Sequence, residues 1–219
     1  MFLLAQHKWL YLGMDFLTRF LVLSLIVAAV VFIVRVPLRN YKSADLSVLK
    51  QMGKWRHPAL SAWMRQVTFL GKHQFLIPAN LVLILILQFL FHESVWAFTY
   101  FSMAVSSLLL MFLFKWMFHR KRPADPYFFE ARGKSFPSGH AMMSVCFYGL
   151  ILIQVHSAGF SSLFLFLITV MGILLILSIV LSRVYLGVHY LSDVLAGFII
   201  GYAWLKIGST FFMKLAQTW

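Results

Sequence analysis

Long apolar runs constrain this chain more than any other feature of its sequence. A transmembrane helix needs about 20 mostly apolar residues. Six stretches meet that requirement, at residues 16–36, 74–91, 95–114, 140–155, 160–181 and 192–212. The first is long for the apolar core of a signal peptide, and no clear small-residue cleavage site follows it, so we expect it to be retained. The sequence therefore predicts an all-α, polytopic membrane protein with a single domain over residues 1–219.

The amino-acid composition agrees with a membrane protein and limits the classes of molecule that the chain is expected to bind. Hydrophobic residues make up 62% of the 219 and charged residues only 11%, whereas a soluble domain is about half apolar and a quarter charged. The single cysteine, Cys146, excludes an intramolecular disulfide and a cysteine-based zinc site. The net charge of +13 would suit nucleic acid, anionic headgroups or a phosphorylated substrate. In so apolar a chain we expect the lipid bilayer and a phosphorylated lipid, not nucleic acid.

Six alternating spans place the connecting segments on defined faces of the membrane. Residues 92–94 and 156–159 form two short connections, which lie on the same side as both termini. The longer connections, residues 37–73, 115–139 and 182–191, all fall on the opposite side. Every polar motif described below lies in or beside these longer connections.

The first long connection is too apolar for a simple loop. Its large apolar residues recur at helical spacing and alternate with lysine and arginine. They are Leu46, Leu49, Met52, Trp55, Leu60, Trp63 and Met64. This pattern predicts amphipathic helices between the first two spans. They would lie in the membrane interface or pack against the bundle, and the sequence favours neither.

The first polar motif follows the third span. Lys115 and Arg122-Pro123 are separated by six residues, a spacing of about two helical turns that would let both cations point the same way. A lysine point charge and a planar arginine fork together suit a bound phosphate. Ordinary cations reaching out of the membrane at a helix end would give a similar pattern.

The second polar motif, Pro137-Ser138-Gly139-His140, directly precedes the fourth span. Ser138 suits an N-cap position, and Gly139 would let the backbone approach a ligand closely. Free N–H groups and the positive end of the helix dipole make such a helix start a natural anion site, with His140 beside it. A capped helix with an interfacial histidine is the plainer alternative.

The third polar motif is Ser182-Arg183, His189 after five residues, and Asp193 four residues later. His189 and Asp193 would share a face if the sixth helix begins here. A carboxylate bonded to one imidazole nitrogen leaves the other free to attack. The alternative is a salt bridge at a helix start, although an ionisable pair beside an apolar span is a functional hypothesis by default.

Taken together, the three motifs favour chemistry over three unrelated structural roles. They bring three cations, an anion-binding helix start, two histidines and an orienting acid to one membrane face. Phosphoryl transfer through a histidine needs these parts. Cations neutralise the phosphate oxygens, one histidine attacks in line, and the other protonates the leaving oxygen.

These residues resemble the signature of the type 2 phosphatidic acid phosphatase family in order and spacing. The signature runs over residues 115–193, and the recognisable region over about 102–202. The string from Tyr185 to Gly197 looks like the bacterial membrane branch. That branch includes phosphatases for phosphatidylglycerol phosphate, phosphatidic acid and undecaprenyl pyrophosphate. Lipid A phosphatases are also related, and six spans argue against the soluble haloperoxidases that share the signature.

The resemblance implies a role for each signature residue and no cofactor. His189 would form a phosphohistidine, Asp193 would orient it, and His140 would act as general acid and then as base. The phosphate would be held by Lys115, Arg122, Ser138, Gly139 and Arg183. The family needs no metal, and one acid near two histidines is a poor metal site.

Substrate and sidedness are less constrained. A monophosphate and a pyrophosphate fit three cations equally well, and residues 124–134 would either select headgroups or serve as a plain connector. Transfer to an acceptor lipid, or phospholipid binding without chemistry, would use a similar chain.

The family resemblance implies that the site lies on the extracytoplasmic face of a bacterial inner membrane. The charge distribution opposes this, because only Lys8, Arg19, Lys206 and Lys214 of the 19 basic residues lie on the terminal side. The sequence does not predict the oligomeric state.

Overall fold

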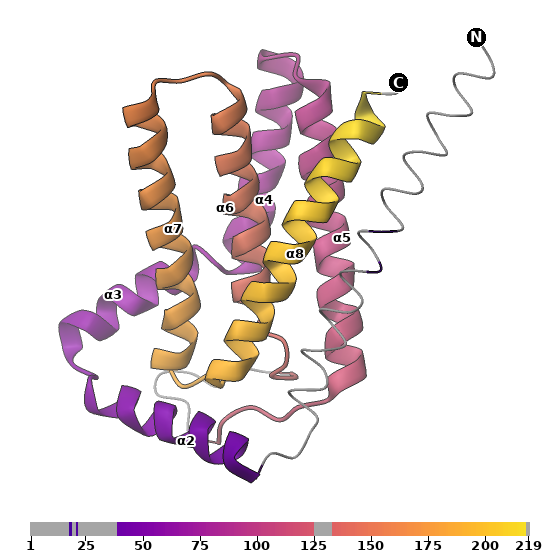
Figure 1. Cartoon of the computed structure of the whole chain (residues 1–219). Helices are drawn as coiled ribbons and strands as arrows, with labels where there is room; N and C mark the ends of the chain where they lie inside the picture. The colour runs from indigo at the N-terminus through magenta and orange to yellow at the C-terminus, as the bar shows by residue number, and fades with distance from the viewer. Residues whose placement is uncertain (1–17, 19–20, 22–38, 125–132, 218–219) are drawn as a thin grey trace.

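The computed structural model describes residues 18, 21, 39–124 and 133–217, and their regular structure is helical throughout (Figure 1). Five helices within these residues are long and apolar enough to cross a membrane. They are α4 (His73–Leu85) with its π-helical continuation η1 (Ile86–Leu90), α5 (Ser94–Phe118), α6 (Gly139–Ser157), α7 (Ser162–Tyr185) and α8 (Leu191–Ala216). These match the last five predicted spans. The first predicted span, 16–36, lies outside the described residues except for Thr18 and Leu21.

At the end of the bundle that carries the polar motifs, two helices extend four residues past their predicted apolar runs. α5 continues to Phe118 instead of 114, and α7 continues to Tyr185 instead of 181. Lys115 and Arg183 therefore stand on the last turn of a helix rather than in a connection. Both residue types are good helix formers and are favoured at a helix C-terminus by the dipole.

Helix α6 lies at the centre of the bundle and contacts α5, α7 and α8, with its most extensive contact against α8. Two glycines on α8 make this contact close. A Cβ on Gly197 would lie 2.5 Å from the carbonyl oxygen of Ser138, and one on Gly201 would lie 2.8 Å from that of Met142. Small residues let membrane helices approach at backbone distance, so the start of α6 is held directly against α8.

The two amphipathic helices predicted between the first two spans are α2 (Arg39–Lys54) and α3 (Pro58–Phe69). Figure 1 shows α2 lying across one end of the bundle and α3 running outward beside α7. Leu49 and Met52 pack against the bundle core, and Leu60 and Met64 pack around Tyr185. The remaining apolar residues of the predicted pattern, Leu46, Trp55 and Trp63, are exposed. The helices therefore use one face for packing and keep exposed apolar side chains on another.

Candidate active site

The three sequence motifs meet at the end of the bundle that α2 crosses. Six of their residues line one cavity of about 780 Å³: Lys115, Arg122, Gly139, His140, Arg183 and His189. Ser138 and Asp193 are fully buried behind this lining. The structure thus brings together residues that the sequence separates by almost eighty positions. Some of these residues line the cavity, and others are buried behind the lining residues.

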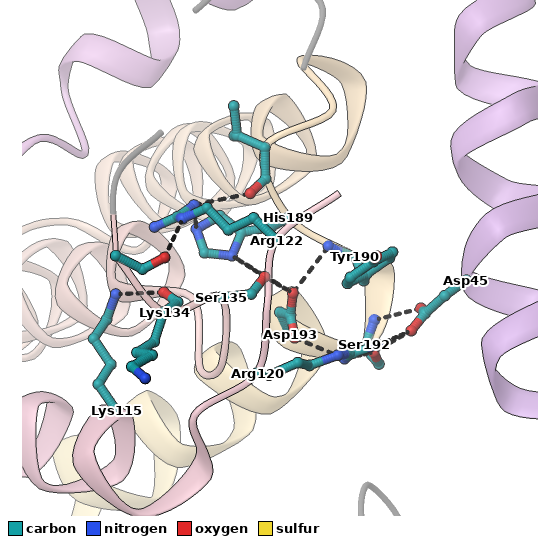
Figure 2. A network of polar contacts seen from close by, with 12 residues as sticks. Asp45, Lys115, Arg120, Arg122, Lys134, Ser135, His189, Tyr190, Ser192 and Asp193 are labelled. Carbon is teal, nitrogen blue, oxygen red and sulfur yellow. Dashed lines mark hydrogen bonds and ion pairs between the residues drawn. The ribbon is translucent and has the colours of Figure 1, made fainter. Parts of the chain in front are cut away.

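His189 lines the cavity and is held in one tautomer. Its side chain is almost wholly buried, and Arg122 Nη1 lies 3.0 Å from its Nε2. Since a guanidinium can only donate, Nε2 accepts and the proton resides on Nδ1. Nδ1 faces Ser135 Oγ at 3.5 Å and Asp193 Oδ2 at 3.7 Å (Figure 2). The lone pair of Nε2 therefore points to the cavity side.

Asp193 is buried and saturated with donors. Its Oδ2 accepts from the hydroxyl of Ser135 and from the backbone N–H of Tyr190 at 3.0 Å. Its Oδ1 accepts from Arg120 Nη1 at 2.7 Å. The prediction that His189 and Asp193 share a helical face is wrong, because α8 begins at Leu191. They meet because the turn before α8 folds His189 back over the helix start.

That turn has a clear local cause. The backbone N–H groups of Val188 and His189 both donate to the carbonyl oxygen of Arg183, at 3.2 and 3.3 Å. Gly187, directly before these two residues, has φ of +71°, a conformation that glycine adopts without steric cost. The end of α7 and the nucleophile candidate are therefore fixed to each other.

A second set of polar residues, which sequence reasoning missed, supports Asp193 from behind. Arg120 bridges Asp193 and Asp45, donating to Asp45 Oδ2 at 2.6 Å through Nη2. Asp45 also accepts from Ser192, from its N–H at 3.1 Å and its hydroxyl at 2.6 Å. The guanidinium of Arg120 lies 4.3 Å from the centre of the Tyr190 ring. Figure 2 shows this chain of contacts running from Asp45 on α2 to the carboxylate of Asp193.

The cations of the first motif converge, but not in the way the spacing predicts. α5 ends at Phe118, and His119 has a left-handed backbone with φ of 41°, so Arg122 is not on the helix of Lys115. Lys115 Nζ instead donates to the carbonyl oxygen of Lys134 at 3.2 Å, and Arg122 Nε to that of Gly133 at 3.2 Å. The neighbouring carbonyl groups of Gly133 and Lys134 therefore hold the two cations.

The helix start of the second motif carries polar atoms that lack partners among the described residues. Ser138 occupies the predicted N-cap of α6, but its hydroxyl makes no capping bond. Its Oγ and the Nε2 of His140 are buried without a hydrogen-bond partner. Buried polar groups are almost always paired, and a phosphate bound at this helix start would offer both atoms a partner. Ser138 is itself fixed by its N–H, which donates to the carbonyl oxygen of Asp193 at 2.9 Å.

Arg183, the third cation, projects from the last turn of α7 and is buried. Its Nη1 donates to the hydroxyl of Thr68 at 2.5 Å. Thr68 belongs to α3, which is also bound to α7 through Ser61 and Tyr185, whose side-chain oxygens are 2.8 Å apart. The peripheral helix α3 therefore sets the position of a cavity cation.

The electrostatics around His189 favour a neutral imidazole. Burial lowers the pKa of His189 from 6.5 to about 4. The nearby cations Arg122 and Arg183 also lower this pKa, whereas the interaction with Asp193 raises it. Burial also lowers the pKa of Arg122. For Arg120, the carboxylates of Asp193 and Asp45 outweigh the burial and raise its pKa. At neutral pH a cationic site therefore surrounds an uncharged imidazole.

Comparison with known proteins identifies the family. The model of the PAP2 superfamily matches residues 96–216, more than half of the chain and all three motifs. The chain belongs to the PAP2 superfamily. This PAP2 protein is also 32% identical over 164 residues to phosphatidylglycerophosphatase B of Bacillus subtilis (strain 168), covering 73% of this chain and 79% of that protein.

Solved structures agree with the family and extend the match to the fold. A crystal structure of a transmembrane PAP2-type phosphatidylglycerolphosphate phosphatase from Bacillus subtilis superposes with a TM-score of 0.76 at 27% identity, over 90% of this chain and 95% of that one. LpxE of Aquifex aeolicus has the same fold, with a TM-score of 0.59 at 23% identity over 80% and 94% of the two chains. The chain is thus an integral membrane PAP2 enzyme, a lipid phosphatase, as its motifs predict.

Proposed function

We propose that this PAP2 phosphatase removes a terminal phosphate from a membrane lipid through a phosphohistidine on Nε2 of His189, without a metal. Phosphatidylglycerol phosphate is the first candidate substrate, since two similar proteins carry that activity in their names. The observation that carries the proposal is a neutral, tautomerically fixed imidazole in a cavity lined by cations, with two unpartnered polar atoms beside it.

The first chemical step follows from the contacts of His189. A phosphate entering the cavity offers Arg122 a better acceptor than Nε2, so the guanidinium moves to the phosphate oxygens and frees the lone pair. Nε2 then attacks phosphorus as the bond to the lipid oxygen breaks. The growing positive charge on the imidazole is stabilised by the carboxylate of Asp193 behind Nδ1. Lys115 and Arg183 neutralise the equatorial oxygens.

His140 serves the leaving group and then water. Its Nε2 lacks a partner among the described residues and belongs to a cavity-lining residue, so it is placed to donate a proton to the departing lipid alkoxide. The neutral His140 then accepts a proton from the water that attacks the phosphohistidine. Cleavage of the phosphorus–nitrogen bond releases inorganic phosphate and restores His189.

The shape of the cavity favours a substrate that stays in the bilayer. Beyond the phosphate end it extends between α4, α5 and α6, and several of its lining residues are also exposed on the outer face of α4 and α5: Ile77, Leu81, Phe101, Val105 and Phe112. The cavity is therefore open to the lipid side between these helices. An acyl or prenyl chain could remain in the membrane while the headgroup reaches His189.

The decisive experiment is phosphate release by the purified protein from a panel of lipid phosphates in the presence of EDTA. We expect release from phosphatidylglycerol phosphate, with phosphatidic acid and undecaprenyl pyrophosphate as comparisons. His189→Ala should abolish release, whereas Arg65→Ala, at an exposed position of α3 away from the cavity lining, should retain it. Acid-labile, base-stable radiolabel on the wild-type protein would identify the phosphohistidine. Loss of activity in EDTA would refute the metal-free mechanism.

We further propose that the site faces the outside of a bacterial inner membrane, as its family resemblance implies. Cys146 is buried, so the native chain offers a low background to thiol reagents. Lys134→Cys places a thiol at an exposed position beside the cavity. An impermeant maleimide should label this variant in intact spheroplasts, and labelling that requires permeabilisation would place the site in the cytoplasm.

A further inference from the structure

Arg183 differs from the other two cavity cations of the signature in the element that holds it. Lys115 and Arg122 donate to carbonyl groups of the connection that precedes α6. Arg183 Nη1 instead donates to the side-chain hydroxyl of Thr68, at 2.5 Å. The family model matches residues 96–216, so this hydroxyl comes from outside the matched region. The three motifs therefore do not include every residue that holds a cavity cation.

The contact between Thr68 and Arg183 is buried on both sides. Thr68, on the last turn of α3, is 1% exposed, and Arg183 is 3% exposed. A hydroxyl oxygen is a suitable acceptor for a guanidinium, whose five N–H donors lie in one rigid plane. A bond at Nη1 therefore restricts the plane in which the other donors can meet a phosphate. Loss of the acceptor would leave a buried charged donor without this partner, which is unfavourable.

The chain that follows Thr68 is fixed to the same end of the bundle, so the hydroxyl is presented by a rigid corner. The N–H of Gly71 donates to the carbonyl oxygen of Thr68 at 3.1 Å. The hydroxyl of Tyr148, on α6, donates to the carbonyl oxygen of Leu70 at 2.9 Å. A Cβ on Gly71 would lie 3.2 Å from the ring of His140. The corner between α3 and α4 is therefore packed against two elements of the site, α6 and α7.

We propose that Thr68 is a positioning residue for phosphoryl transfer, because its hydroxyl holds the guanidinium of Arg183 in the orientation that binds the phosphate. This inference rests on the proposed function and adds a residue of α3 to the site. A purely structural bond between helices would have a different effect, and Ser61 provides the comparison. Its hydroxyl lies 2.8 Å from that of Tyr185 and also joins α3 to the last turn of α7, but Tyr185 lies outside the cavity lining.

The test measures phosphate release by full-length variants in detergent micelles, with phosphatidylglycerol phosphate and phosphatidic acid as substrates and inorganic phosphate as inhibitor. Thr68→Val keeps the volume and removes the acceptor. Its kcat/KM should fall by about tenfold to 140-fold, the scale of one hydrogen bond to a charged group. The inhibition constant of inorganic phosphate, which has no lipid chain, should rise by at least about threefold. Thr68→Ser keeps the hydroxyl and should restore both values to near those of the wild type.

Two comparisons separate positioning from a general loss of structure. Ser61→Ala removes a buried hydroxyl between the same two helices. It should lower the thermal unfolding temperature while kcat/KM and the inhibition constant stay near those of the wild type. Arg183→Lys keeps a cation but loses the planar fork. If Thr68 acts through Arg183, Thr68→Val should have little further effect on kcat/KM in the Arg183→Lys background.

The outcomes that would overturn the proposal are distinct from failure of the proposed function. Thr68→Val with kcat/KM and phosphate inhibition within about twofold of the wild type would overturn it. So would a loss that Thr68→Ser does not restore, an equal loss in Ser61→Ala, or full additivity with Arg183→Lys. Thr68→Ala removes the same hydroxyl and provides the same test if Thr68→Val does not fold. Absence of phosphate release by the wild type from every lipid would instead refute the proposed function.

Discussion

Arg120 offers the sharpest test of how this site is held together, because it binds the carboxylate of Asp193 without lining the cavity. Its guanidinium donates to Asp193 Oδ1 at 2.7 Å and to Asp45 Oδ2 at 2.6 Å. We expect Arg120→Met to lower kcat strongly while KM changes by less than about threefold. The reason is that Asp193 would lose the donor that fixes its plane, whereas the phosphate-binding cations would stay in place.

The size of the loss follows from the burial of the pair. The side chain of Arg120 is 20% exposed and that of Asp193 is not exposed at all. A hydrogen bond to a charged group is worth about 1.5–3 kcal/mol, and at about 1.4 kcal/mol per decade this corresponds to a loss in kcat of about 10-fold to 140-fold. Asp45→Asn should have a smaller effect, about threefold to tenfold, since Arg120 would keep its bond to Asp193.

The assay is steady-state phosphate release in detergent micelles, with thermal unfolding to confirm that each variant is folded. Arg120→Lys is the informative conservative change, because one ammonium reaches one carboxylate but does not bridge two as the fork does. Its kcat should fall between those of the wild type and Arg120→Met. Lys121→Met, at the exposed neighbouring position, is the matched control and should retain full activity.

Two results would refute this reasoning. A folded Arg120→Met protein with kcat within twofold of the wild type would show that Ser135 and the N–H of Tyr190 suffice to hold Asp193. A loss confined to KM would show that Arg120 acts on substrate binding instead. A shift in the acid side of the pH profile in Arg120→Met, without such a shift in Lys121→Met, would support positioning over a merely structural role.

Two further predictions concern pH and packing. The pKa of His189 is lowered to about 4 in the folded protein, so protonation of this imidazole opposes both folding and attack. The stability of the folded protein that comes from keeping His189 neutral is complete above pH 6.5 and is lost as the pH falls toward 4. The acid side of the kcat/KM profile should therefore lie nearer 4 than 6.5, and an inflection at 6.5 that Asp193→Asn leaves in place would contradict it. Gly197→Ala should destabilise the protein by about 1–3 kcal/mol, measured by thermal unfolding, because its Cβ would lie 2.5 Å from the carbonyl oxygen of Ser138. Gly53→Ala is the control, since its Cβ meets only the end of the Arg56 side chain at 3.9 Å, and unchanged stability in Gly197→Ala would show that the two helices can separate.

The sequence predicts well whatever depends on local pattern. Five apolar runs appear as helices because length and hydropathy determine spanning segments, and the signature residues line or support one cavity because the motifs are specific. The ends of the helices were predicted poorly, because the hydropathy falls at Lys115 and Arg183 while the helical conformation continues past them. The bridge from Asp45 to Arg120 was out of reach. It joins residues 75 positions apart. No pattern in the sequence predicts that α2 would contact the segment that follows α5.

The hydrogen bonds around His189 are distributed unequally, and this inequality explains how a resting site can be both rigid and reactive. Behind the imidazole, Asp193 receives donors from Ser135, Tyr190 and Arg120, so the proton on Nδ1 has a fixed direction. At the start of α6, Ser138 Oγ and His140 Nε2 have no described partner, and a bound phosphate would supply one. Arg122 stands between the two sides, bonded to Nε2 at 3.0 Å. Its transfer from the imidazole to the phosphate would couple substrate binding to exposure of the nucleophile.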